Sequence, residues 1–318
     1  MRQHFRLNQA NPWIVGFVNK NNKFCNILAV LILLLVFAAQ GNGMQSLVIF
    51  ILSAVGLLGV SFSVVAAPEI SSVDSSLVRN ASAEQSSQAV DIIRRADRIR
   101  APAEPFRYAL TLIEMKGEQE VSRQSLDVAM RFYKPTAEQA GDARALVRFV
   151  DPPTERGKSL LSIFDKLWYY EPKLRRPIPI SRQQRLVGQV SNGDVVATDF
   201  DLSYVSVLAA TEDCDGRPCY RLELQRRFPH VTYPKINYWV DVETYRPFKA
   251  EFLSTGNKVL KRAWYKDYKL ALGEQRPHEI YIEDSLKKEQ YTRMLYSDVR
   301  LEEVPEAYFQ KEYLLRLR

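Results

Sequence analysis

Hydrophobic and polar residues alternate with a period of two along most of the chain from Phe106 onward. Such alternation is typical of β-strands, whose successive side chains point to opposite faces of a sheet. Short turns separate about ten to thirteen such segments, without intervening helices, so one large antiparallel sheet is expected. The predicted strands are residues 106–113, 126–133, 146–150, 159–164, 167–171, 204–210, 219–226, 235–242, 248–253, 258–268, 279–283 and 289–296.

Helical periodicity is scarce in this sequence. The segment "QAVDIIRRADRIRAP", from Gln88, predicts a helix that Pro102 ends, and "SRQQRLVGQ" (181–189) and "VPEAYFQKEYLLRL" (304–317) predict two short ones. Several strands present a continuous apolar face that water cannot cover, so the sheet must curl or meet a second layer. The expected fold class is mainly β: a large curved antiparallel sheet, in the form of an unclosed β-barrel, with a few lid helices.

The strand at 159–164 is apolar on both faces. Leu160 and Phe164 share one parity, Leu161 and Ile163 share the other, and aromatic residues 168–170 follow. A strand of an antiparallel sheet with one wet face alternates cleanly, so this one is expected to be covered on both sides. Two interpretations fit: an inner face toward a cavity with an outer face under aromatic or loop cover, or a central strand between two protein layers.

The N-terminal part contains two apolar blocks, residues 24–39 and 47–67, and no acidic residue precedes Glu69. Basic residues before an apolar block and small residues after it are typical of an export signal, and cleavage after Ala66 or Ala67 is expected. An uncleaved membrane anchor or hairpin is the alternative, and the true start could also lie downstream. The predicted organisation is therefore 1–67 as a signal peptide or N-terminal membrane anchor, 68–87 as a flexible linker, and 88–318 as the folded domain.

The bulk charge gives no support to nucleic-acid binding. The chain has 44 Lys and Arg against 37 Asp and Glu, a net charge of +7. The segment 1–67 holds four bases and no acid, so its removal lowers the net charge to +3. A surplus this small is not the footprint of a nucleic-acid-binding domain.

The sequence also lacks the groups that most catalytic and metal sites need. Only His230 and His278 follow residue 67, and neither has a Cys or His neighbour at metal-ligand spacing. No nucleophile-elbow, phosphate-loop, dinucleotide or zinc-protease motif occurs. We therefore expect no enzyme activity, no cofactor and no metal.

Two cysteines, Cys214 and Cys219, flank Asp-Gly-Arg-Pro, a sequence typical of a hairpin loop. Facing residues of such a hairpin are close enough for a disulfide, which needs an oxidising compartment. Two reduced buried thiols are the alternative. The third cysteine, Cys25, lies inside the first apolar block.

Four blocks in order resemble one known family. They are "LVRFVDPPTERGKSLLSIFDKLWYYEPKLRR", "QRLVGQVSNGDVVATDF", "DGRPCYRLELQ" and "VTYPKINYWVDVETYRPFKAEFLSTGNKVLKRAWYKDY". The sequence is similar here to the outer-membrane lipoprotein-sorting protein family, the LolA-like domains of Gram-negative bacteria, over about residues 88–318. The resemblance implies an unclosed barrel whose concave face is lidded by helices, in a protein that carries acyl chains or other lipids across the periplasm. No individual ligand residue carries over.

The expected function is a periplasmic carrier that binds acyl chains of lipoproteins or other lipids for transfer toward the outer membrane. The partners expected with it are an inner-membrane transporter and an outer-membrane acceptor, and the carrier is expected to be a monomer; anchoring to the inner membrane is the fallback location. A lipid-sensing interaction module or an accessory protein of a lipid transporter is the alternative function.

Candidate site residues fall into two sets. The first set is apolar strand residues that either line a ligand cavity or form an ordinary core: Leu126, Val128, Met130, Phe132, Leu161, Ile163, Tyr220, Leu222, Tyr238, Val240, Phe248 and Phe252. The second set comes from "KLRRPIPISRQQR", residues 173–185, which holds five bases and no acid, with Leu186 beside it. This second set is either a solvated loop or a lid and docking rim for anionic head groups or an acidic partner: Arg175, Arg176, Arg182, Arg185 and Leu186.

Overall fold

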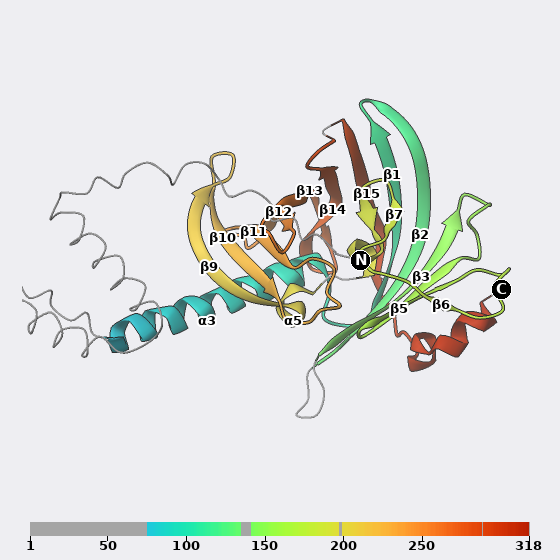
Figure 1. Ribbon diagram of the computed structural model, residues 1–318, viewed down its shortest axis with the longest axis horizontal. Coiled ribbons are helices and arrows are strands. Elements are labelled where there is room, and N and C mark those ends of the chain that lie inside the picture. The colour runs from blue at the N-terminus through green and yellow to red at the C-terminus, as the bar shows by residue number, and fades with distance from the viewer. Residues whose placement is uncertain (1–74, 135–140, 197–198, 288, 318) are drawn as a thin grey trace, which may run out of the picture. The chain divides into compact units, whose positions relative to one another are not determined.

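The computed structural model describes residues 75–134, 141–196, 199–287 and 289–317 (Figure 1). The predicted signal peptide or anchor at 1–67 lies outside the described residues. Among the helices that are described, none is both long and apolar enough to cross a membrane.

The fold is one large antiparallel sheet, which confirms the predicted fold class. The sheet has 13 strands in the order β6-β5-β4-β3-β2-β1-β15-β14-β13-β12-β11-β10-β9, and its edge strands β6 and β9 do not pair with each other. The strands of this sheet and of a small β7–β8 hairpin are β1 Phe106–Lys116, β2 Gln119–Tyr133, β3 Asp142–Asp151, β4 Ser159–Ile163, β5 Lys166–Tyr170, β6 Ile178–Pro179, β7 Arg185–Val187, β8 Val190–Ser191, β9 Tyr204–Asp213, β10 Pro218–Arg226, β11 Lys235–Asp241, β12 Pro247–Leu253, β13 Val259–Ala271, β14 Glu274–Asp284 and β15 Gln290–Leu301.

The helices are few and mostly short. They are α3 Ser75–Arg100, α4 Asn192–Val196 and α5 Phe200–Ser203, followed by the 3-10 helices η1 Glu306–Phe309 and η2 Lys311–Arg316. We call the inner face the side of the sheet whose buried side chains form one cluster with those of α3, α4 and α5. β1 and β15 pair at the middle of the sheet, with Leu110 opposite Tyr296. The first and the last strand of the domain in sequence order are therefore neighbours.

The long helix α3 packs against β9, β12 and β14. Its buried residues Ala89, Ile92, Ile93 and Ala96 follow helical spacing and join the main core. The helix begins at Ser75 and not at Gln88, so residues 75–87 of the predicted flexible linker are helical. The physical reason is that no Gly or Pro interrupts the sequence between Ser75 and Arg100.

The prediction of a short helix at 181–189 is wrong, because this segment forms no helix. It contributes the β7–β8 hairpin, which turns at Gly188 with φ of +52°. A Cβ at Gly188 would clash with Thr292 and approach Glu114 Cγ to 3.0 Å, so the hairpin turn lies directly against β1 and β15. Glycine permits both the left-handed backbone and this close approach.

The strand β4 is covered on both faces. Leu160 belongs to the main core on the inner face, whereas Leu161 packs on the opposite face with Phe309 and Leu314 of the C-terminal 3-10 helices. The predicted C-terminal capping helix is therefore two 3-10 helices, which cover the outer side of the sheet. This double cover explains why both parities of β4 are apolar.

Candidate functional site

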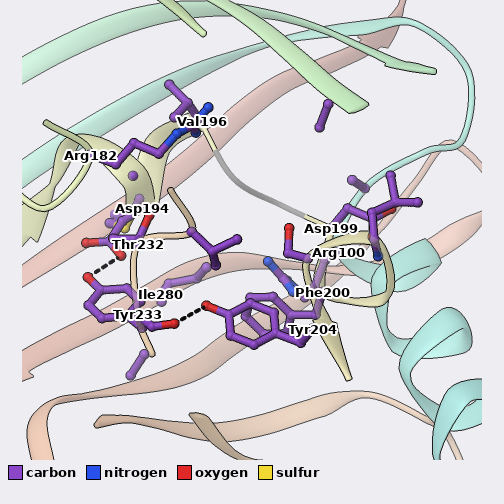
Figure 2. A pocket seen from close by; sticks show the side chains of 18 of the residues that line it. Arg100, Arg182, Asp194, Val196, Asp199, Phe200, Tyr204, Thr232, Tyr233 and Ile280 are labelled. Carbon is purple, nitrogen blue, oxygen red and sulfur yellow. Dashed lines mark hydrogen bonds between the residues drawn. The ribbon is translucent and has the colours of Figure 1, made fainter. Parts of the chain in front are cut away.

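A cavity of about 140 Å³, partly open to solvent, lies between the inner face of the sheet and the helices α3, α4 and α5 (Figure 2). Its lining is mainly apolar. Engineered apolar cavities of about 150 Å³ take up benzene, so this space is large enough for an apolar group of about that size. Apolar and aromatic side chains that form its walls include Phe106, Phe252, Tyr265, Ile280, Ile282 and Met294.

The helix α4 forms one wall and is held by a buried polar network around Asp194. The Asp194 carboxylate accepts hydrogen bonds from Tyr233 Oη at 2.8 Å and from Ser191 N and Oγ at 2.8 Å, and it pairs with the ammonium group of Lys261. Lys261 also donates to the Gln189 carbonyl oxygen at 3.0 Å. Every charge in this network has a partner, as a buried ion pair requires, so we assign it to fastening α4 against β13.

A second buried network fastens α5 to the end of α3. The Arg100 guanidinium pairs with Asp97 at 3.0 Å and lies 4.0 Å from the ring centroid of Phe200. Asp97 also accepts hydrogen bonds from the backbone N–H groups of Phe200 and Asp201. Burial, and then repulsion from Asp199, raises the pKa of Asp97 well above its usual range.

The residue before α5, Asp199, caps that helix by accepting the N–H of Leu202 at 2.7 Å. Burial is the main cause that raises the pKa of the Asp199 carboxyl. The pKa values of both carboxyl groups beside α5, those of Asp97 and Asp199, are therefore raised, and these groups lose their protons at a higher pH than an ordinary aspartate does.

Arg276 closes the same end of α3. Its guanidinium donates to the carbonyl oxygens of Arg98 at 2.6 Å, Ile99 at 3.1 Å and Ala271 at 3.0 Å. The last carbonyl groups of a helix have no partner within the helix, and here an arginine on β14 supplies one. α3 is therefore anchored to the sheet beside the cavity.

Both histidines of the domain line the cavity. His230 stacks on Phe228 at 5.4 Å and contacts Phe164 at 5.2 Å between ring centroids. Burial, and then the neighbouring Arg182, lowers the pKa of His230, so its ring is neutral at pH 7. Among the described residues, no group of three or more His, Cys, Asp or Glu side chains could hold a metal ion.

Most of the predicted cavity residues lie on the inner face but in the packed core around the cavity. Phe252 lines the cavity itself. The core members are Leu126, Val128, Met130, Leu222, Tyr238 and Val240, with Phe132 and Tyr220 packed partly buried against them. A ligand-contacting role for these residues stays a prediction.

Three of the predicted cavity residues lie elsewhere. Leu161 and Ile163 pack on the outer face under the C-terminal helices, because their parity on β4 is opposite to that of Leu160. Phe248 packs beside Trp239 and the two cysteines of the β9–β10 hairpin. These three do not line the cavity.

The predicted rim residues also separate into two environments. Arg175, Arg176 and Arg185 are exposed, and Leu186 is half-buried against the main core. Arg182, in contrast, lines the cavity beside α4 (Figure 2). The sequence does not predict α4 and α5, since helices of five and four residues show no measurable helical period.

The predicted disulfide is present. Cys214 and Cys219 are bonded across the β9–β10 turn, with their Cα atoms 5.9 Å apart. The bond lies beside Trp239, and neither cysteine lines the cavity.

Comparison with known proteins places this fold in a family. A family model described as "Uncharacterized protein" matches residues 141–316. No curated protein matches the sequence. A solved structure of a LolA superfamily protein from Nitrosomonas europaea is 33% identical, with 71% of this chain and 98% of that chain covered and a TM-score of 0.64.

Two more distant structures share the fold. A putative outer membrane lipoprotein-sorting protein domain from Vibrio parahaemolyticus is 20% identical to this chain. The match covers 73% of this chain and 100% of that chain, with a TM-score of 0.61. A DUF1329 family protein from Desulfovibrio piger is 18% identical, with 72% of this chain and 99% of that chain covered and a TM-score of 0.62. The sheet, the cavity and these similarities agree, and the chain belongs to the LolA superfamily.

Proposed function

We propose that the protein is a periplasmic carrier that binds acyl chains of lipoproteins or other lipids in the cavity and transfers them toward the outer membrane. The observation that carries this proposal is the cavity itself, which has a mainly apolar lining between the curved sheet and three helices. The donor would be an inner-membrane transporter and the acceptor an outer-membrane protein or the outer membrane.

The energetics favour such a site. Exposing an acyl chain of about sixteen carbons to water costs about 12 kcal/mol, at about 0.8 kcal/mol for each methylene group. A cavity with walls such as Ile280, Ile282 and Met294 offsets part of this cost without any catalytic group. Flexible and aromatic side chains also adapt to tails of different length and branching.

The two short helices have the position of a lid. α4 and α5 supply Asp194, Val196 and Phe200 to the cavity wall. They are held by polar contacts and also by the burial of Val195, Val196 and Phe200 in the main core. Polar contacts can exchange with water at low net cost, since each is worth only about 0.5–1.5 kcal/mol, or about 1.5–3 kcal/mol where one group is charged. We propose that these helices act as a lid that opens for a ligand while the paired strands of the sheet stay in place.

The test is native mass spectrometry of the protein purified from the periplasmic fraction without detergent. We expect co-purifying acyl species, and we expect Ile280→Trp to reduce them strongly because the indole fills the cavity. Val121→Trp is the matched control, since Val121 is 56% exposed and does not line the cavity. An empty wild-type protein, or equal lipid content in Ile280→Trp and wild type, contradicts the carrier.

A further inference from the structure

Three arginines, Arg100, Arg182 and Arg276, line the cavity, and two of them are fully engaged by the protein. Arg100 is paired with Asp97 and packed against the ring of Phe200. Arg276 gives its N–H groups to three backbone carbonyl oxygens. Neither of these two is available to a ligand without the loss of contacts that hold α3.

Arg182 is different. Its Nη2 donates to Ser162 Oγ at 2.7 Å and to the Phe164 carbonyl oxygen at 2.8 Å, both neutral acceptors. Its Nε is buried and has no hydrogen-bond partner among the described residues. None of the carboxylates that the structure describes forms an ion pair with Arg182.

The acidic side chains nearest to Arg182 do not neutralise it by contact. Asp142 and Asp165 act on it only at longer range. Asp142 already accepts hydrogen bonds from Arg144 Nε at 3.0 Å and from the backbone N–H of Phe164 at 3.0 Å. Burial lowers the pKa of Arg182, yet a guanidinium stays protonated at neutral pH.

Aromatic side chains lie beside Arg182. The rings of Phe164, Phe228 and His230 contact one another beside it and line the cavity. The Arg182 carbonyl oxygen accepts the N–H of Gly193 at 2.8 Å, which fixes the residue against the start of α4 (Figure 2). A half-buried cation whose buried Nε–H has no acceptor gains most from an anionic ligand, because charge-assisted hydrogen bonds are the strong ones.

We propose that the cavity binds amphiphiles with an anionic head group, and that Arg182 binds the carboxylate or phosphate of that head group. This inference rests on the proposed carrier function and adds a ligand class to it. The Arg182 side of the cavity, with Phe164 and His230, takes the head group. The walls formed by Ile280, Ile282 and Met294 take the first part of the tail.

The experiment compares three ligands with the same tail: palmitate, hexadecyl phosphate and hexadecanol. Affinities are measured by displacement of a fluorescent fatty acid from the protein in the form in which cells produce it. Wild type is expected to prefer the two anions over the alcohol by about tenfold or more, the size of one charge-assisted contact. Arg182→Gln is expected to abolish this preference and to bind hexadecanol as wild type does.

Two further variants separate charge from structure. Arg182→Lys keeps the positive charge and is expected to retain most of the preference, even if Arg182→Gln folds poorly. Arg227→Gln removes an exposed arginine that does not line the cavity, and it is expected to leave all three affinities unchanged. A tighter complex with hexadecyl phosphate than with palmitate assigns the site to a phosphate head group, and the reverse order assigns it to a fatty acid; either order supports the proposal.

The contrary outcomes are distinct from one another. Equal affinity of wild type for hexadecanol and for both anions overturns the anion site and leaves the carrier function intact. An unchanged preference in Arg182→Gln also overturns the site. Failure of wild type to bind any of the three amphiphiles contradicts the carrier function, and the anion site with it.

Discussion

The carboxylate of Asp97, on α3, accepts a hydrogen bond from the backbone N–H of Phe200, the first residue of α5, at 2.8 Å. The two residues are 103 positions apart in the sequence, and this bond joins the long helix to the wall of the cavity. The same carboxylate pairs with Arg100, so one side chain holds a helix end, a lid helix and a buried cation.

We expect Asp97→Ala to lower the free energy of unfolding by about 3–5 kcal/mol, because it leaves a buried arginine without its partner. Asp91→Ala is the matched control on the same helix. Asp91 pairs with Arg95 at 2.9 Å, but both side chains are more than half exposed, so its loss costs about 0.5 kcal/mol or less. Urea unfolding followed by circular dichroism measures both, and equal effects would show that the buried pair has no special weight.

The carboxyl groups beside α5 predict a dependence of stability on pH. An unfolded aspartate has a pKa of about 3.9, whereas burial raises the pKa of Asp97 and Asp199 in the fold. The folded chain therefore holds protons that the unfolded chain has released, and the contribution of these groups to stability falls as the pH rises from about 4 through the raised pKa values.

The variant Asp199→Asn tests this dependence. It removes one titrating group and its repulsion of Asp97, and the amide oxygen can still accept the N–H of Leu202. The Tm of the variant should equal that of wild type near pH 4 and exceed it increasingly toward pH 8. Glu303→Gln, at an exposed carboxyl, controls for the lost charge. A Tm difference that stays constant between pH 4 and 8 contradicts the assignment.

The alternation of apolar residues was sufficient to predict the sheet, because burial of one face imposes a period of two on every strand. It also predicted that β4 is covered twice, since both Leu160 and Leu161 are large and apolar. Alternation alone does not say which parity faces inward, because an apolar side chain suits either cover. That is why Leu161 and Ile163 were grouped with residues that pack on the other face.

The cavity could not be predicted in the same way. Its lid depends on contacts between distant parts of the chain, such as Asp97 with Phe200 and Asp194 with Lys261. No local pattern encodes such contacts. Arg182 looked like one member of a solvated cationic run, and only the fold shows that its side chain turns inward while Arg175 and Arg176 remain exposed.

The outer cover of the sheet is expected to stabilise the fold. Leu314 is fully buried with Leu161 and Phe309, whereas its neighbour Leu315 is 44% exposed. Leu314→Ala should lower the free energy of unfolding by about 2–5 kcal/mol, the usual cost of a leucine truncated in a core. Leu315→Ala, the matched control, should cost about 0.5 kcal/mol or less. Similar losses in the two variants, measured by urea unfolding, would mean that the C-terminal helices do not seal this face.

The disulfide should matter to stability and not to binding. Replacing Cys214 and Cys219 together by Ser opens a short loop, which we expect to cost about 2 kcal/mol. Since neither residue lines the cavity, the affinity for palmitate should stay unchanged. Thermal unfolding of the variant, and of wild type with and without reductant, gives the first quantity, and probe displacement gives the second. A loss of affinity without a loss of stability would contradict this placement.

We expect the exposed arginines Arg175 and Arg176 of the segment 173–185 to dock the protein on an anionic surface. Arg182 of the same segment lines the cavity and does not share this role. Arg175 and Arg176 form no ion pair within the part of the chain that the structure describes, so their charge is free to meet an anionic surface. Each basic residue near such a surface is worth about 1 kcal/mol, so reversing both to Glu should weaken binding to phosphatidylglycerol vesicles by about tenfold or more.

The Tm of this double variant should match that of wild type, because neither side chain is packed. Lys258→Glu with Lys287→Glu is the matched control: it makes the same change of net charge at exposed positions in other turns. Vesicle co-sedimentation measures the effect, which should shrink as salt rises because exposed charges are screened. Docking through this segment is contradicted if the control pair weakens vesicle binding equally, since only bulk charge would then be acting, or if Arg175→Glu with Arg176→Glu lowers the Tm to the same degree as it lowers binding.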